Sequence, residues 1–261
     1  MKRIFIASAV IFFITSANAQ TANVSPGKKI QLTSINNINI TMSVMGNDMD
    51  IKNESTNQIE FELKSIDGKK VTFIATRKLT KIKSSSPMGE QEFSSDDSSL
   101  ASNPLVAEAF KNINKPETVS GELGKPLAMT DDAMAGKNLD VMVLFLFNPF
   151  NAEAKEGSNF SDSTTTEDGS KFVNNYTVTK HTKEEITVAV SSTNTILGTK
   201  QQGPVEVKMN MKGASTEIRI YDAVTGLLKT ETTSFSMGGT TEAQGMTMPM
   251  TGKGTGTIIV K

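Results

Sequence analysis

Apolar and polar residues alternate along much of this chain with a period of two. In the N-terminal part the alternation covers Lys29–Ile35, Ile38–Val44 and Ile59–Leu63. Successive side chains of a strand point to opposite faces of a sheet, so this period is typical of strands with one face on a core and one in water. The pattern predicts half-buried antiparallel strands.

A hairpin is predicted where two of these runs meet. Asp67 and Gly68 stand between Ile59–Leu63 and Val71–Ala75. Asp-Gly is favoured in tight hairpin turns because both residues tolerate positive φ. We therefore expect the two runs to pair across this turn.

The C-terminal half has the same character. Alternating or β-branched runs cover Phe172–Thr179, Glu185–Ser191, Val205–Met211, Glu217–Tyr221, Leu227–Phe235 and Thr257–Lys261. Asp222 and Gly226 flank a segment with the composition of a tight turn. The simplest topology is a meander. Gly252–Gly256 precedes the last run and is interpreted as a hairpin loop or bulge.

The composition changes around residues 98–170, which we interpret as a helical and loop insert. Asn103–Lys111 has a capping residue, Pro104 in its first turn and helical apolar spacing, which predicts a short helix. Leu139–Phe147 is the most hydrophobic stretch after the N-terminus and is too short for a membrane span. We expect it to be a buried core element, and a patch that faces lipid or a partner is the alternative.

The N-terminus predicts export. Lys2 and Arg3 precede the apolar stretch Ile4–Ile14, and small residues lead up to Ala19. This is the pattern of a secretory signal peptide cleaved after Ala19, and the apolar stretch is shorter than a transmembrane helix. We expect a single β-rich domain over residues 20–261, periplasmic or extracellular in a bacterium and not membrane-spanning after cleavage.

Residue usage argues against several chemistries. The chain has no Cys, one His and a formal net charge of −1. Disulfides, Cys nucleophiles and most zinc sites are excluded, and nucleic acid is not an expected partner because basic residues do not cluster. His181 lies between two lysines and is interpreted as a solvated turn residue. No cofactor is expected.

Acidic pairs do not improve the case for an enzyme. Asp96-Asp97 and Asp131-Asp132 are adjacent acids, and neighbours in a strand point to opposite faces. The chain also has no Trp and only two Tyr, whereas carbohydrate sites usually stack sugars on aromatic rings. The protein is therefore expected not to be an enzyme, and no catalytic residue is assigned.

Methionine suggests an alternative. The chain has 14 Met, and Met246, Met248 and Met250 are two residues apart. Thioethers suit Cu(I), so a Met-rich periplasmic Cu(I)-binding protein is one alternative function. The simpler interpretation is an adaptable apolar surface, because alternate residues of a strand share one face.

The most favoured function is non-catalytic binding of an apolar or amphipathic ligand, such as a lipid, or of an envelope partner. A structural envelope scaffold is the other alternative. The expected ligand-binding face carries Met42, Val44, Phe61, Leu63, Phe73, Met209, Met211 and Phe235.

Several segments together carry a resemblance. They are the signal end Ala17–Gln20, the insert Asn103–Lys111, Gly121–Pro126 and Tyr221–Leu228. With these, the chain resembles an uncharacterised exported β-rich family of bacterial envelopes, a domain of unknown function. As a fold it is more distantly similar to the lipoprotein-carrier half-barrels, whose concave apolar face holds acyl chains. The expected fold is mainly β, a curved antiparallel sheet or incomplete barrel with one or two covering helices.

Overall fold

The computed structural model describes residues 23–87, 89–97, 110, 112–125, 127–129, 145–150, 154–165, 169–202 and 205–261. The predicted signal peptide and all but one residue of the predicted helix lie outside them. No helical element occurs among the described residues, so the expected covering helices are not supported. Correspondingly, the described part of the chain has no helix long and apolar enough to span a membrane.

The described residues form twelve strands. They are β1 (Lys29–Val44), β2 (Asn47–Asp67), β3 (Lys70–Ser86), β4 (Gly89–Ser94), β5 (Pro116–Glu122), β6 (Ala128–Met129), β7 (Asn159–Thr165), β8 (Lys171–His181), β9 (Glu185–Gln202), β10 (Val205–Asp222), β11 (Leu228–Ala243) and β12 (Met246–Val260). Strands β5 to β7 fall within the region interpreted as an insert, so its described parts extend the sheet.

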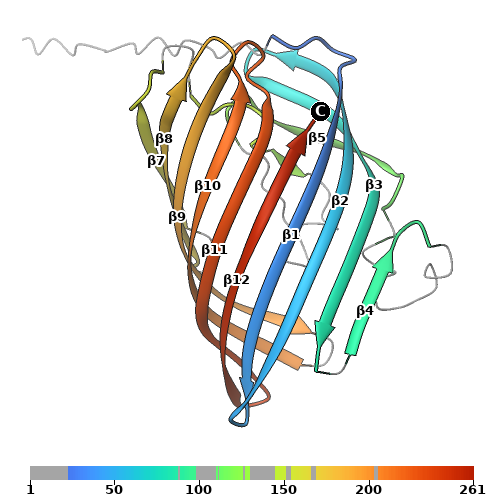
Figure 1. The fold of residues 1–261 in the computed structure, drawn as a ribbon, viewed down its shortest axis with the longest axis vertical. Coiled ribbons are helices and arrows are strands. Elements are labelled where there is room, and N and C mark those ends of the chain that lie inside the picture. Colours follow the sequence, from blue (N-terminus) through green and yellow to red (C-terminus); the bar gives the residue numbers. More distant parts are fainter. Residues whose placement is uncertain are drawn as a thin grey trace, which may run out of the picture.

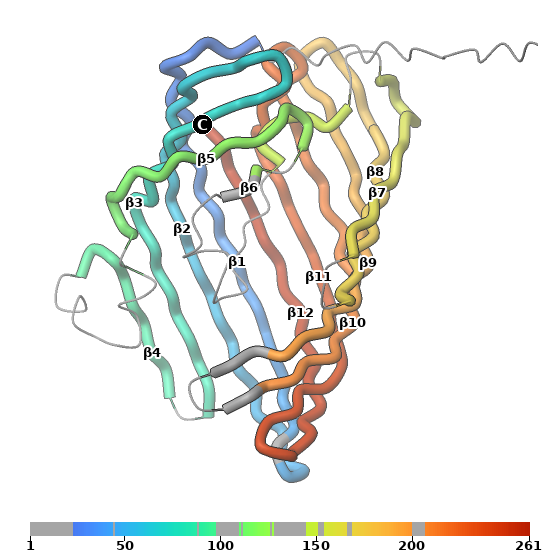
Figure 2. Tube along the Cα trace, turned by 180° about the vertical axis from the view of Figure 1, so that it is seen from behind, coloured from blue at the N-terminus to red at the C-terminus, as the bar shows by residue number. Residues whose placement is uncertain are grey.

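All strands belong to one antiparallel sheet. Its order is β6-β5-β3-β2-β1-β12-β11-β10-β9-β8-β7, and β4 pairs with β3 beside this path. Among the described residues no pairing joins β7 to the other end, so the sheet is open. It curls into a trough that narrows toward the β1–β2 and β11–β12 turns at the lower end (Figures 1 and 2). The expected curved antiparallel sheet is confirmed.

The two ends of the described chain meet at the centre of the sheet. Strand β1 pairs with β12 on one side and with β2 on the other. Asn36 and Asn37 have a partner in both neighbours, so the alternating runs Lys29–Ile35 and Ile38–Val44 belong to one continuous strand. Pairing on both sides satisfies the backbone of this strand, whatever the local propensity of Asn.

Both predicted turns form. Asp67 pairs with Lys70, which leaves Gly68 and Lys69 as the two-residue loop, with φ of 58° at Gly68. In the second turn, Oδ1 of Asp222 accepts hydrogen bonds from the backbone N–H groups of Val224 and Thr225 at 3.1 and 2.7 Å. Gly226 then takes φ of 71°.

The hydrophobic core fills the upper part of the trough. Residues 145–150, here called the crossing segment, connect its two walls. Phe147 stacks on Phe73 of β3 at a centroid distance of 6.1 Å, and Phe145 packs edge-on against Tyr176 of β8 at 5.9 Å. Leu146 is fully buried. The described end of Leu139–Phe147 is therefore a core element, as predicted.

The segment Gly252–Gly256 was expected to form a hairpin loop or bulge, but it belongs to strand β12. Gly252, Gly254 and Gly256 lie on the concave face of this strand. A Cβ at Gly254 would lie 2.6 Å from the ring of Phe235, and one at Gly252 would lie 3.1 Å from Cγ of Met237. The missing side chains let two residues of β11 lie over β12, a packing role that local sequence does not show.

Candidate functional site

The register of the sheet defines three groups on the concave face. Core residues mark this face, and every second residue of the same strand shares it. The polar band comprises Ser34, Asn36, Asn57, Thr80, Glu217, Arg219, Glu231 and Thr233. Below it, the apolar floor comprises Ile38, Ile40, Phe235 and Met237. Lowest is the methionine row, Met49, Met42 and Met250.

The residues predicted to bind a ligand separate into two sets. Phe61, Leu63 and Phe73 are no more than 2% exposed and belong to the core. Met211 is also buried. Met42, Met209 and Phe235 are half-buried on the lower concave face. Val44 lies at the end of β1, and its side chain is outside the described part. The core residues cannot form an accessible ligand surface.

A charged cluster forms the centre of the polar band. Arg219 of β10 is 5% exposed and forms an ion pair with Glu217. Its Nε also lies 3.0 Å from Oε2 of Glu231 on β11, within ion-pair distance although the alignment is not that of a hydrogen bond. One guanidinium thus holds two carboxylates inside the trough.

Aromatic rings cover this cluster. The guanidinium carbon of Arg219 lies 4.2 Å from the ring centroid of Phe145 and 5.9 Å from that of Tyr176. The Tyr176 hydroxyl donates a hydrogen bond of 3.3 Å to Oδ2 of Asp162. The hydroxyl of Tyr221 is buried with no hydrogen-bond partner among the described residues. The cluster is therefore built into the base of the core.

Burial changes the titration of these groups. It raises the pKa of Glu231, and the attraction of Arg219 only partly offsets that effect. Burial also disfavours the charged form of Arg219, but the negative groups around it, including Glu217 and Glu231, outweigh burial and raise its pKa. Arg219 stays charged, whereas burial favours the protonated form of Glu231.

A small cavity opens beside the cluster. Its volume is about 100 Å³, and it is lined by Asn36, Glu231, Thr233, Phe235, Gly256, Thr257 and Ile258. The absence of a side chain at Gly256 creates part of this space. A few water molecules or a small polar group fit there, since one water has about 30 Å³ of liquid volume. A whole acyl chain does not fit.

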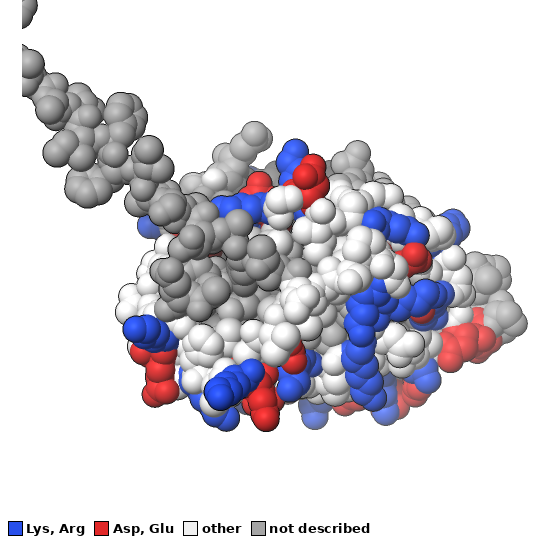
Figure 3. All heavy atoms as spheres, turned by 90° about the horizontal axis from the view of Figure 1, so that it is seen from above, with Lys and Arg blue, Asp and Glu red and all other residues white. Residues whose placement is uncertain are grey.

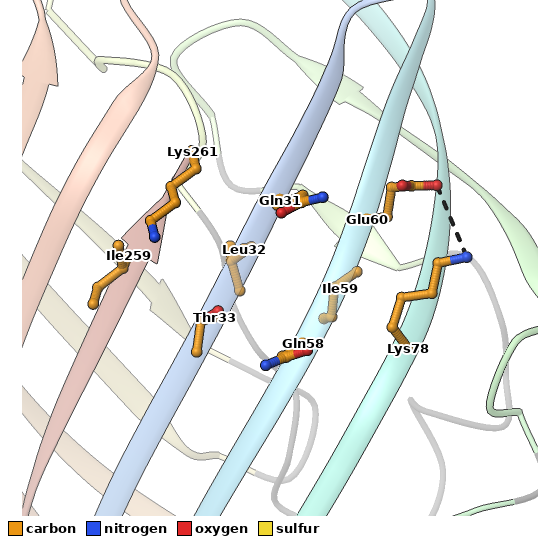
Figure 4. Close-up of a pocket in the computed structure, with 9 residues that line it drawn as sticks. All are labelled: Gln31, Leu32, Thr33, Gln58, Ile59, Glu60, Lys78, Ile259 and Lys261. Atoms are coloured by element: carbon orange, nitrogen blue, oxygen red, sulfur yellow. Dashed lines mark ion pairs between the residues drawn. The ribbon is translucent and has the colours of Figure 1, made fainter. Parts of the chain in front are cut away.

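The larger depression lies on the opposite face of the sheet. It has a volume of about 280 Å³ and is lined by Gln31, Leu32, Thr33, Gln58, Ile59, Glu60, Lys78, Ile259 and Lys261 (Figure 4). Lys78 and Glu60 lie 3.9 Å apart at its edge. Most of these side chains point away from the trough. Apart from Lys78 and Glu60, the residues that line the depression carry no pair of charged groups close to each other.

His181 and the described acidic pair, Asp96-Asp97, lie in loops or at a strand end. His181 is exposed at the end of β8, and its Nδ1 donates a hydrogen bond of 2.6 Å to the carbonyl oxygen of Ala154. Asp96 accepts a hydrogen bond from Ser94 in a loop after β4. Asp131 and Asp132 lie outside the described residues. Within the described ranges, no three His, Cys, Asp or Glu residues could hold a metal ion.

Met246, Met248 and Met250 share the concave face of β12, as their spacing predicts. Met246 is 40% exposed at the start of the strand, whereas Met250 is half-buried beside Met42. Pro249 lies one residue beyond the last pair of β12 with β1, so its missing N–H interrupts no ladder between these two strands.

Sequence reasoning missed the charged cluster. In β10, Glu217 and Arg219 face the trough, whereas Ile218 points outward and is 44% exposed. The alternation was visible, but its apolar members were assumed to face the core. The available signal was the presence of opposite charges two residues apart, which share one face of a strand.

Charged side chains of both signs are interspersed on the face seen from above. Among the described residues in this view, basic and acidic side chains have uncharged atoms between them (Figure 3). Several are paired in exposed ion pairs, such as Lys229 with Glu185 at 2.9 Å. These contacts do not form a focused binding site for a polyanion.

The fold and the concave face define an open antiparallel half-barrel with a sealed upper core and a half-buried lower floor. No protein-family model matches the chain, and no curated protein is significantly similar to it. An outer membrane channel from Pseudomonas putida F1 aligns with 94% of this chain and 98% of its own at 7% identity and a TM-score of 0.31. OccK7 (OpdD) from Pseudomonas aeruginosa aligns with 90% of this chain and 99% of its own at 6% identity and a TM-score of 0.27. Scores this low do not establish a common fold.

Proposed function

We propose that this protein is an exported, non-catalytic binding protein for an amphipathic molecule, which it holds on the apolar floor of the trough. The observation that carries the proposal is the change in side-chain burial along the concave face. Above the polar band the trough is a sealed core, whereas Ile38, Ile40 and Phe235 below it are only half-buried. An apolar surface left partly uncovered in this way is suited to a ligand.

The shape of the floor favours an extended ligand. Phe235 and Met237 lie over glycines of β12, so their side chains lie along the sheet rather than across the trough. Ile38 and Ile40 continue this surface on β1. An apolar chain placed along the strands would contact all four residues.

The polar band would receive the other end of the ligand. The small cavity at Gly256 adjoins the floor through Phe235 and is lined by Glu231, Asn36 and Thr233. A hydroxyl, amine or amide group could form hydrogen bonds there. A second carboxylate would be repelled unless Glu231 were protonated, so we expect a neutral or cationic polar end.

Binding without chemistry is part of the proposal. The two acids that converge, Glu217 and Glu231, are both held by Arg219. A general acid and base must reach a substrate, whereas these carboxylates are engaged with one buried cation. Their position supports a structural and recognition role.

The proposal is tested by direct binding of a fluorescent apolar probe. Dansyl-labelled undecylamine should bind the purified protein saturably, and the Ile40→Gln variant should bind it at least about tenfold more weakly, equal to about 1.4 kcal/mol. Ile35→Gln is the matched control, because Ile35 is on the same strand but faces outward and is 38% exposed. The Ile35→Gln variant should bind the probe as tightly as the wild type does.

Native mass spectrometry of the protein from its own envelope would then identify the ligand class. A bound amphipathic molecule supports the proposal. Equal probe binding by Ile40→Gln and Ile35→Gln would reject the concave floor as the site. A copurifying protein with no probe binding would favour an envelope partner or scaffold instead.

A further inference from the structure

The methionine row is a second feature of the trough, separate from the apolar floor. Met42 of β1 pairs in register with Met49 of β2 on one side and with Met250 of β12 on the other. All three share the concave face and are half-buried. Three thioethers from three adjacent strands therefore stand side by side at the narrow end of the trough.

This arrangement differs from the three methionines that are close in sequence. Along one strand, residues four apart are separated by about 13 Å at about 3.3 Å per residue, which separates Met246 from Met250 too widely for easy convergence. Neighbouring strands are only about 5 Å apart. The sheet thus brings together Met42, Met49 and Met250, and it leaves Met246 at the exposed end.

Glycines leave space around the row. Gly239 is the partner of Met250 on β11, so no side chain stands between Met250 and the next strand at this level. Gly252 is the next concave residue of β12, and the sulfur of Met237 lies 3.5 Å from the place that its Cβ would occupy. Met237 therefore lies over β12 at Gly252, two residues from Met250 along that strand, and offers a fourth sulfur.

From this geometry we propose that Met42, Met49 and Met250 form a binding site for a soft monovalent metal ion, Cu(I), with Met237 as an additional ligand. Thioethers are neutral, soft donors that favour Cu(I) over the harder divalent ions. Methionine is unbranched with three rotatable bonds, so side chains in neighbouring strands can turn toward one ion. Binding requires no change of oxidation state, because the ion is taken up as Cu(I).

The surroundings of the site agree with this choice of metal. The chain has no Cys and one His, and His181 is on β8, four strands from β12 in the order of the sheet. The methionine row itself contains no carboxylate. A hard cation such as Ca²⁺ or Mg²⁺ would lack the oxygen ligands that it requires.

The test is a titration of the purified protein with Ag(I), a redox-inert probe for Cu(I), followed by competition for Cu(I) with bicinchoninate under reducing conditions. The wild type should bind one equivalent. Met42→Leu and Met250→Leu should each weaken binding at least about tenfold, since each removes one sulfur while nearly preserving volume. Met246→Leu is the matched control on the same strand and face, and Met45→Leu is a control at an exposed turn. Both should bind as the wild type does.

A second measurement does not depend on variants. In protein labelled with ¹³C at the methionine methyl groups, Ag(I) should shift the signals of the row and leave that of Met45 unchanged. Absence of saturable binding, or equal losses in Met42→Leu and Met246→Leu, would overturn the proposal. Met42→Leu should still bind the dansyl probe, and Ile40→Gln should still bind Ag(I). Loss of binding at one site is therefore distinguishable from loss of binding at the other.

Discussion

Arg219 of β10 lies over the ring of Phe145, with 4.2 Å between the guanidinium carbon and the ring centroid. The contact joins the sheet to the crossing segment at the boundary between core and polar band. It also explains how a charge is tolerated so deep in the trough, because Arg219 has a ring on one side and two carboxylates, Glu217 and Glu231, as ionic partners.

Replacement of this arginine should strongly destabilise the protein. Arg219→Met leaves the buried carboxylate of Glu231 and the half-buried one of Glu217 without a cation, and breaking a buried pair in this way costs about 3–5 kcal/mol. Urea unfolding at neutral pH measures the change. Lys212→Met, on the outward and exposed side of β10, should stay within about 0.5 kcal/mol of the wild type. Equal effects of the two substitutions would contradict a central role for Arg219.

Glu231 should make stability depend on pH in a defined direction. Its pKa is raised on folding from a usual value of 4.5. The folded protein therefore holds this proton more tightly than the unfolded chain, and stability falls as pH rises from 4.5 through the raised pKa. Glu231→Gln should remove that decline. Urea unfolding at a series of pH values tests this, and an unchanged pH profile in the variant would contradict the assignment.

Gly254 should not tolerate a methyl group. A Cβ there would lie 2.6 Å from the backbone oxygen of Asn37 and 2.6 Å from the Phe235 ring, so Gly254→Ala should cost about 1–3 kcal/mol through overpacking. At Gly238 the nearest atom is 3.8 Å away, and Gly238→Ala should be neutral or slightly stabilising. Thermal unfolding compares the two. Adding Phe235→Leu to Gly254→Ala should recover part of the loss, and no recovery would mean that the ring is not the cause.

The crossing segment should be essential to the core. Leu146 is 0% exposed, and Leu146→Ala should cost about 2–5 kcal/mol through lost burial and the cavity left behind. Val224→Ala, at a turn position that is 63% exposed, should change stability by less than about 0.5 kcal/mol. Urea unfolding measures both. A small effect at Leu146 would mean that the segment does not hold the walls together.

The turn at Asp222 should contribute stability that is lost in acid. Hydrogen bonds from Thr225 hold the pKa of this carboxyl below its usual value of 3.8. Its contribution is present above that usual value and falls as pH drops through the lowered pKa. Asp222→Ala should cost about 1–3 kcal/mol at neutral pH, as expected for hydrogen bonds to a charged group. In urea unfolding the difference from wild type should shrink in acid, and a constant difference would contradict this origin.

Local sequence determined the alternating parts of β1 to β3 and of β8 to β12, the two turns and the buried character of residues 145–147, but not β4 to β7. Period-two alternation predicts strands because it reflects the geometry of a single chain, and Gly68 and Asp222 act within their own turns. For the candidate site, the sequence predicted seven residues that do share the concave face. It could not separate the sealed Phe61 and Phe73 from the half-buried Met42.

The tertiary structure decided what faces the trough and which strands are neighbours. Ile218 points outward because Arg219 finds charged and aromatic partners on other elements, so the phase of the β10 alternation depends on contacts distant in sequence. Gly254 belongs to a strand because it pairs with Ile38 of β1 on one side and with Phe235 of β11 on the other. The pairing of β1 with β12 places Met42 beside Met250, and no local pattern could have predicted it, since register between distant segments is set by the packing of the whole sheet.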